Sequence, residues 1–305
     1  MRNLSRTGIV LLVAIFMAMA SSAECFGQKK EKAPKAPKAP KAAKGKTTAP
    51  SAYNLVYKIP AGKTLSYTGK TDMFMVMDFN GQTFNVNVNA VLSCTATGKG
   101  EEGGNLKLEI KIDSLGQSTD TPQGSAGGLI TEVSGKTFTM ILSPAGKEVD
   151  LKDAEKIKFS QEGVEVNVAQ SFIDYFPDLP GKPVKIGDTW PTDDTVSSKA
   201  GTTTVKQITH AENTFAGIET IDGVECAKIT SVLTGTRETS AQTMGTDFTQ
   251  SFKFTGTADL FFAIREGYYI RQTANSKMTG MMEITSQGMS MPITGDLVSV
   301  SRLKK

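Results

Sequence analysis

The stretch MFMVMDFNGQTFNVNVNA, residues 73–90, decides the fold of this chain. Apolar and polar residues alternate on both sides of Asn80-Gly81. Asn-Gly between two alternating runs predicts a β-hairpin, because both central residues of a type I′ turn need positive φ. A two-residue loop also fixes the register and gives the hairpin one Met, Phe and Val face, which we expect to be buried. The cross-strand pairs that this register predicts are Met77 with Phe84, Met75 with Val86, and Met73 with Val88.

The same two-residue period continues through most of residues 51–305. Asp222-Gly223 predicts a second hairpin, and glycine-containing turns separate the other alternating runs. The sequence therefore predicts an all-β protein of antiparallel strands. Besides the first hairpin, the expected strands are residues 106–112, 215–221, 224–232, 252–264, 268–273, 281–285 and 297–300.

One segment shows a helical period instead. Apolar residues at positions 168, 169, 172, 175 and 176 follow Asn167 and precede Pro177. Asparagine is a common N-cap and proline ends helices, so we expect one short helix here.

Short motifs recur at similar spacing and suggest an internal duplication. Residues 62–65 match 187–190, Gly104 matches Gly223, and residues 135–146 match 256–267 in the same order. We therefore expect two similar β units, 51–176 and 177–305, with the short helix at their joint. They would form a partly closed barrel or a clam-like pair of sheets.

The N-terminus is typical of an exported protein. Residues 1–27 combine a positive start with an apolar run, which is too short to span a bilayer and is followed by small residues, as in a signal peptide. Cys25 raises the alternative of a lipid anchor, although Glu24 stands where a lipoprotein signal has a small residue. We expect a periplasmic or extracellular protein without a transmembrane span in its mature form.

Residues 28–50, QKKEKAPKAPKAPKAAKGKTTAP, form a lysine-, alanine- and proline-rich linker. The segment has no apolar face to bury, so it predicts a disordered spacer. Its charge favours weak contact with anionic envelope surfaces. Nucleic-acid binding is not expected, because the basic tract lacks aromatic residues and the remaining chain is acidic.

Four short motifs stand along the chain: YNLVY at 53–57 with AGKT at 61–64, LSPAGK at 142–147, LP at 179–180 with VKIGDTW at 184–190, and FA at 262–263 with EG at 266–267. In this order they resemble a family of uncharacterised exported bacterial β-rich proteins, a domain of unknown function. The resemblance spans most of residues 51–305 and implies an extracytoplasmic β-rich protein, but it supplies no catalytic residues. A looser likeness, of architecture alone, is to lipoprotein-carrier half-barrels, in which a curved sheet holds an apolar ligand.

The chain lacks the residues that most catalytic mechanisms need. His210 is the single histidine, which argues against triads and His-built metal sites, so no cofactor or metal is expected. The Gly-Lys-Thr sequences lack the preceding glycine of a phosphate loop. Cys94 lies on the apolar side of its expected strand, so we expect a buried and inert thiol. The alternative that Cys94 and Cys226 form a disulfide is left open by the sequence. Asp193-Asp194 is interpreted as a pair of solvated loop charges. A hydrolase remains an alternative, because the two carboxylates of a glycosidase need not be close in the sequence.

Methionine is the one unusual enrichment, with 13 in the chain. Two clusters, near the first hairpin and near the C-terminus, would meet if the sheet closes on itself. They would then fill the core or line a soft cavity for an apolar or lipid-like ligand. The residues of this candidate site are Met73, Met75, Met77, Met281, Met282, Met289 and Met291.

Three functions follow from these observations. The first is a non-enzymatic binding module of the bacterial envelope that holds an apolar or lipid-like ligand between its halves. The second is a structural or interaction protein with a solid core. The third, a hydrolase that uses two distant carboxylates, has the least support.

Overall fold

The computed structural model describes residues 52–304 apart from 80, 162–163, 244–245 and 286–287. The predicted signal peptide, the linker and Cys25 lie outside the described residues. The first-half strands and helices are β1 (Thr64–Phe79), β2 (Gln82–Glu102), β3 (Asn105–Thr121), β4 (Gly124–Leu129), a 3₁₀ turn (Thr131–Val133), β5 (Thr137–Leu142), β6 (Glu148–Asp150), α2 (Lys152–Glu155), β7 (Lys158–Gln161), β8 (Val164–Asn167) and a second 3₁₀ turn (Val168–Ser171). The second-half strands are β9 (Thr189–Ala200), β10 (Thr203–Ile221), β11 (Val224–Thr243), β12 (Thr246–Ala263), β13 (Tyr268–Ile284) and β14 (Met289–Leu303).

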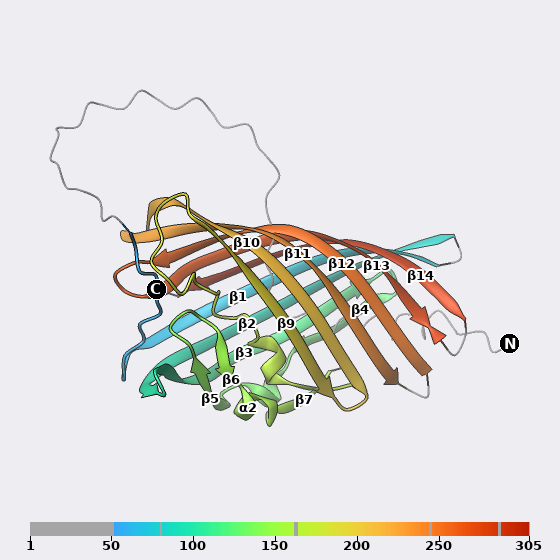
Figure 1. Cartoon of the computed structure of the whole chain (residues 1–305). Helices are drawn as coiled ribbons and strands as arrows, with labels where there is room; N and C mark the ends of the chain where they lie inside the picture. Colours follow the sequence, from blue (N-terminus) through green and yellow to red (C-terminus); the bar gives the residue numbers. More distant parts are fainter. Residues whose placement is uncertain (1–51, 80, 162–163, 244–245, 286–287, 305) are drawn as a thin grey trace.

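The fold is all-β, as predicted. Twelve strands form one antiparallel sheet in the order β6-β5-β3-β2-β1-β14-β13-β12-β11-β10-β9, with β4 beside β3 (Figure 1). The sheet curls so that β9 to β12 pass in front of β1 to β3, but it does not close into a barrel. A small β7–β8 hairpin lies off the main sheet. No helix among the described residues is long and apolar enough to cross a bilayer.

The first hairpin has the predicted register. Met77 pairs with Phe84, and the next inward pairs follow two residues apart as expected. Met77 and Val86 are buried, whereas Asn85 and Asn87 are exposed on the opposite face. The backbone N–H of Gly81 (φ 76°) donates to Asp78 Oδ1 at 3.1 Å, which helps to close the turn.

The second predicted hairpin is also confirmed. Asp222 and Gly223 both have positive φ, 53° and 83°, and Ile221 pairs with Val224 across them. The strands are longer than the sequence runs predict. The two runs expected at 268–273 and 281–285 belong to one strand, β13, because its small and polar residues between them also pair with β12 and β14.

The expected helix at the joint is only the 3₁₀ turn Val168–Ser171. Asn167 makes no side-chain capping bond, and Asp174 already has a positive φ of 55°, so the helical path ends early. The apolar residues of the predicted helix are nevertheless all buried. The helical period therefore predicted correctly which residues are buried, but it predicted wrongly that they form a helix.

The two halves form one continuous sheet rather than a clam-like pair of sheets. β1 pairs with β14 over eleven residues, from Tyr67 with Leu303 to Met77 with Ile293. Consecutive strands are neighbours in both halves: β1, β2 and β3 in the first, and β9, β10 and β11 in the second. The next neighbour of β11 is the single strand β12, whereas at the corresponding place β3 pairs with two short strands, β4 and β5. The internal duplication itself stays a prediction.

Residues 53–59, which precede β1, have no regular secondary structure apart from one isolated bridge, and they lie at one end of the sheet (Figure 1). Tyr53 pairs with Val184, and the N–H groups of Tyr57 and Lys58 donate to the carbonyls of Pro144 and Gly267. The Tyr57 ring packs edge-on against Phe262 and Phe176, with ring centroids 5.2 and 5.8 Å apart. We call residues 53–59 the strap. It belongs to the larger apolar core, which fills one end of the curled sheet.

Candidate functional site

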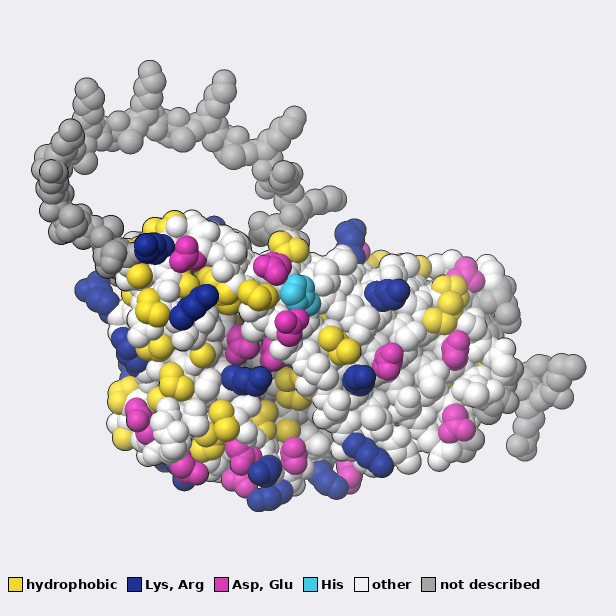
Figure 2. All heavy atoms as spheres, viewed as in Figure 1, with side chains coloured by type: hydrophobic (Ala, Val, Ile, Leu, Met, Phe, Trp, Pro, Cys, Tyr) yellow, Lys and Arg dark blue, Asp and Glu magenta, His cyan; other side chains and the backbone are white. Residues whose placement is uncertain are grey.

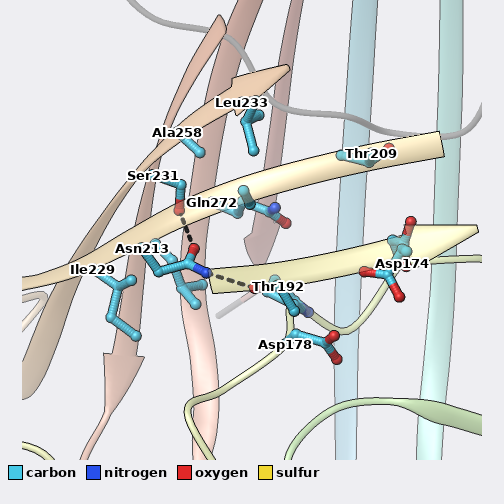
Figure 3. A pocket seen from close by; sticks show the side chains of 14 residues that line it. Asp174, Asp178, Thr192, Thr209, Asn213, Ile229, Ser231, Leu233, Ala258 and Gln272 are labelled. Atoms are coloured by element: carbon cyan, nitrogen blue, oxygen red, sulfur yellow. Dashed lines mark hydrogen bonds between the residues drawn. The ribbon is translucent and has the colours of Figure 1, made fainter. Parts of the chain in front are cut away.

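A hollow of ≈ 100 Å³ opens on the inner face of the sheet, between β9 to β13 and the turn at residues 174–178 (Figure 3). Its lining combines apolar side chains, which we call the floor, with polar side chains, which we call the rim. The floor is formed by Ala211, Ile229, Leu233, Ala258 and Leu260. The rim and walls are formed by Asp174, Pro177, Asp178, Thr192, Asp194, Thr209, Asn213, Ser231 and Gln272.

Strand alternation places these side chains inside. On β10, Thr209, Ala211 and Asn213 are two residues apart and therefore face the same side. Asn213 holds three strands together, because its amide donates to Thr192 Oγ1 at 2.5 Å and accepts from Ser231 Oγ at 2.6 Å. This network fixes one wall of the hollow, as Figure 3 shows.

Two carboxylates of the hollow have perturbed acidities. Burial raises the pKa of Asp178 to about 6, and nearby Asp194 adds to the shift. Burial also raises the pKa of Asp194, while Lys147 opposes the shift and Asp193 adds to it. The expectation that Asp194 is a solvated loop charge is therefore wrong. It lies on strand β9 and is only half exposed. The polar sequence of residues 189–200 did not lead us to predict a strand there.

A third carboxylate, Glu148, lies behind the same turn. Its Oε1 accepts the N–H of Phe176 at 3.4 Å. Burial raises the pKa of Glu148 to about 8, Asp178 adds to the shift, and backbone N–H groups oppose it. The protonated form is therefore favoured in the folded protein near neutral pH.

We expect Glu148 to make the protein less stable as pH rises. An acid whose pKa is raised by folding from 4.5 to about 8 binds more protons when folded, so stability falls between these values and is flat above. Glu148→Gln keeps the acceptor for Phe176 but removes the charge. The full shift corresponds to about 5 kcal/mol, but the Glu148 side chain is partly exposed and solvent screens its charge. At pH 9 the variant should therefore be more stable than the wild type by roughly 2 kcal/mol, and at pH 4 the two should agree. Urea unfolding across this pH range measures the difference.

The matched control is Glu225→Gln on the exposed start of β11. It should leave the pH dependence of the urea midpoint unchanged. Equal midpoints for wild type and Glu148→Gln at pH 9 would contradict a buried, destabilising charge.

The structure brings the two predicted methionine clusters together. Met73, Met75 and Met77 on β1 lie beside β14, and Met291 on β14 pairs with Met282 on β13. These five side chains are buried in a second apolar cluster, and Met289 packs against it. Met281 lies on the other face, because its neighbour Met282 points inward. Leu233 and Ala258 belong both to this cluster and to the floor of the hollow, so the two features adjoin.

The other residues singled out from the sequence are placed as follows. Cys94 and Cys226 are both free and buried, so no disulfide joins them. Cys94 is buried as predicted, and burial raises the pKa of its thiol to about 12, which disfavours the reactive thiolate. His210 lies on the outer face, where Asp193 Oδ1 is 2.7 Å from its Nδ1, and it stands between acidic groups in Figure 2. The described residues contain no group of three or more His, Cys, Asp or Glu that could hold a metal.

The hollow itself was not predicted from the sequence. Asp178 and Glu148 stand in short, irregular stretches, and only the folding of the 174–178 turn against β9 and β10 brings them near Asp194. The small residues Ala211 and Ala258 were a usable signal. Alanine and serine on the inward positions of long strands leave space that larger side chains would fill.

No family model matches the chain, and no curated protein matches it. Similar solved structures include a protein from Bacteroides fragilis with a YmcC-like fold, named as exported (8% identity, 82% of this chain and 99% of that one, TM-score 0.21). Others are OccK2 from Pseudomonas aeruginosa (5% identity, 79% and 98%, TM-score 0.26) and DynF of the dynemicin biosynthesis pathway of Micromonospora chersina (5% identity, 85% and 92%, TM-score 0.24). Exported and outer-membrane proteins are thus among the similar structures, at scores too low to show a shared fold or family.

Proposed function

We propose that this chain is an exported, non-enzymatic binding module of the bacterial cell envelope, which holds an apolar or lipid-like ligand on the inner face of its curled sheet. The observation that carries the proposal is the hollow, whose lining brings apolar and polar side chains together. Such a lining suits an amphiphile, because its chain can contact the apolar side chains while its polar group contacts the polar ones.

The methionine cluster extends the binding surface that we propose. The floor of the hollow continues into it through Leu233 and Ala258. Methionine side chains are flexible and adapt to the shape of an apolar guest. The ligand would lie between the second half and the joint, since the lining strands are β9 to β13 and the covering turn is at 174–178.

Filling the hollow should abolish binding. Ala211 lies on its floor and is half-buried, so Ala211→Phe places a ring where the ligand chain would lie. We expect the affinity for the apolar dye N-phenyl-1-naphthylamine to fall about tenfold or more, as for the loss of a well-packed apolar contact. Fluorescence titration measures the change.

The control is Ala216→Phe on the same strand, where Ala216 is exposed. It makes the same substitution outside the hollow and should leave dye affinity unchanged. Native mass spectrometry of gently purified wild-type protein provides a second readout. Dye affinity that is absent in the wild type, together with a mass free of bound lipid, would contradict the proposal and favour a structural or interaction protein with a solid core.

A hydrolase is the second candidate, favoured by one observation. Asp178 and Asp194 line the same hollow, and the pKa of each is raised, as for a carboxyl that acts as a general acid. Turnover of glycosides or esters by the wild type, lost in Asp178→Asn and Asp194→Asn, would support it. A broad substrate panel without turnover would contradict it.

A further inference from the structure

A row of small and polar side chains crosses the inner face of the sheet, and two of its alanines, Ala258 and Ala274, belong to the second apolar cluster. The cross-strand pairing connects its members one to the next. We call this the polar row; in strand order it is Gln117 (β3), Ala90 (β2), Thr71 (β1), Ser299 (β14), Ala274 (β13), Ala258 (β12), Ser231 (β11) and Asn213 (β10).

One end of the polar row lies in the hollow. Asn213, Ser231 and Ala258 all line it. The other end is Gln117, five strands away from Ala258. At about 4.8 Å between neighbouring strands this is about 24 Å along the sheet. That length is comparable with an extended long-chain acyl group, and the curl of the sheet shortens the direct path.

Gln117 is the unusual member of the row. Its side chain is 5% exposed, yet neither its amide nitrogen nor its amide oxygen has a hydrogen-bond partner among the described residues. Thr119, on the same face two residues on, is 1% exposed, and its hydroxyl also has no partner in the described part of the chain. Buried polar groups are almost always paired, because leaving one unpaired destabilises the folded protein. These atoms therefore point to a partner that binds there.

The chemistry of the unmet groups defines the partner. A primary amide offers N–H donors and a carbonyl acceptor together, so its complement must also both accept and donate. A charged head group would be costly in this buried place without an opposite charge to pair with it. An uncharged amide or hydroxyl satisfies both conditions.

We propose that Gln117, assisted by Thr119, binds the uncharged polar end of a long-chain amphiphile, an amide or an alcohol, whose chain follows the polar row towards the hollow. This inference rests on the proposed function and names the class of its ligand. It assigns to β3 a recognition role that is separate from the acidic rim of the hollow.

The test compares two probes that differ only in the polar end, dodecanamide and dodecane, as competitors for bound N-phenyl-1-naphthylamine. The wild type should release the dye at an about tenfold lower concentration of dodecanamide, the effect of one or two net hydrogen bonds. Gln117→Leu should remove this preference while leaving dodecane unchanged. Gln117→Met, another apolar residue of similar size, should behave alike if the leucine variant folds poorly.

The control is Gln82→Leu, the same substitution at an exposed position of β2. It should keep the preference for dodecanamide. The ligand-free Gln117→Leu protein should also unfold at a higher urea concentration than the wild type, because an unpaired buried amide is gone. A lower midpoint for both Gln117 variants, with Gln82→Leu unchanged, would show that water already satisfies the amide and would overturn the inference.

The two proposals fail differently. A wild type that binds no dye contradicts the binding function as a whole. A wild type that binds dye but prefers neither probe, or a preference that survives in Gln117→Leu, contradicts only the role of Gln117.

Discussion

Gly280→Ala is expected to destabilise the protein by about 3 kcal/mol, near the upper end for overpacked sites. Gly280 lies in the middle of β13, opposite Phe252 of β12. A Cβ at this position would run into the backbone oxygen of Ser251 and the ring of Phe252, and would lie 3.0 Å from the Phe252 Cα. Backbone atoms within a paired sheet cannot withdraw without breaking the ladder. A large fall in the urea midpoint measures the effect.

Gly69→Ala is the matched control. Gly69 lies in the middle of β1, where an added Cβ would be 3.7 Å from the Leu92 oxygen and 3.9 Å from the Val300 oxygen, which are ordinary contacts. Alanine in a strand loses less conformational freedom on folding than glycine, so this variant should be neutral or more stable by about 0.5 kcal/mol. Similar midpoints for Gly280→Ala and Gly69→Ala would contradict the close approach of β12 to β13.

Tyr57→Ala should destabilise the protein by about 4 kcal/mol, as for other large aromatic residues removed from cores. Tyr57 is 2% exposed and its hydroxyl donates to the Pro177 oxygen at 3.0 Å. Its loss removes the edge-on contacts with Phe262 and Phe176 and leaves a cavity between the strap, the sheet and the 174–178 turn. Thermal and urea unfolding measure the change.

Lys58→Ala tests whether the loss comes from the ring. Lys58 is exposed, and its backbone N–H donates to the Gly267 oxygen, a bond that alanine keeps. Its Cβ and Cγ also lie beside Gly267, and alanine keeps the Cβ. The midpoint of this variant should stay within about 0.5 kcal/mol of the wild type, as for an ordinary surface substitution. Equal losses for the two variants would show that the strap is held by its backbone rather than by the buried ring of Tyr57.

The sequence predicts the local features of the fold well. Asn80-Gly81 and Asp222-Gly223 each mark a hairpin, because a two-residue turn with positive φ constrains the chain strongly. The register of the first hairpin and its buried Met and Val face follow from the turn alone. Cys94 was correctly placed on the buried side of its strand for the same reason.

The features that remain unpredicted depend on contacts between distant segments. Nothing near Tyr67 in the sequence shows that it pairs with Leu303, so the single continuous sheet could not be foreseen. The positions of the strap and of the 174–178 turn depend on packing against Phe262 and β10, which lie far away in the sequence. The candidate site is the least predictable feature from the sequence, because Asp178, Asp194 and Glu148 belong to three separate segments that come together only in the folded chain.

The hydrogen-bonded ladder between β1 and β14 has a consequence for biogenesis. A polypeptide is synthesised and translocated from its N-terminus, so β1 emerges long before its neighbour β14 exists outside the ribosome or the export channel. Until the last residues arrive, the edge of β1 that β14 will occupy is open to other strands. We therefore expect this protein to depend on chaperones until its final strand is released, and C-terminal truncations to aggregate rather than to fold in part.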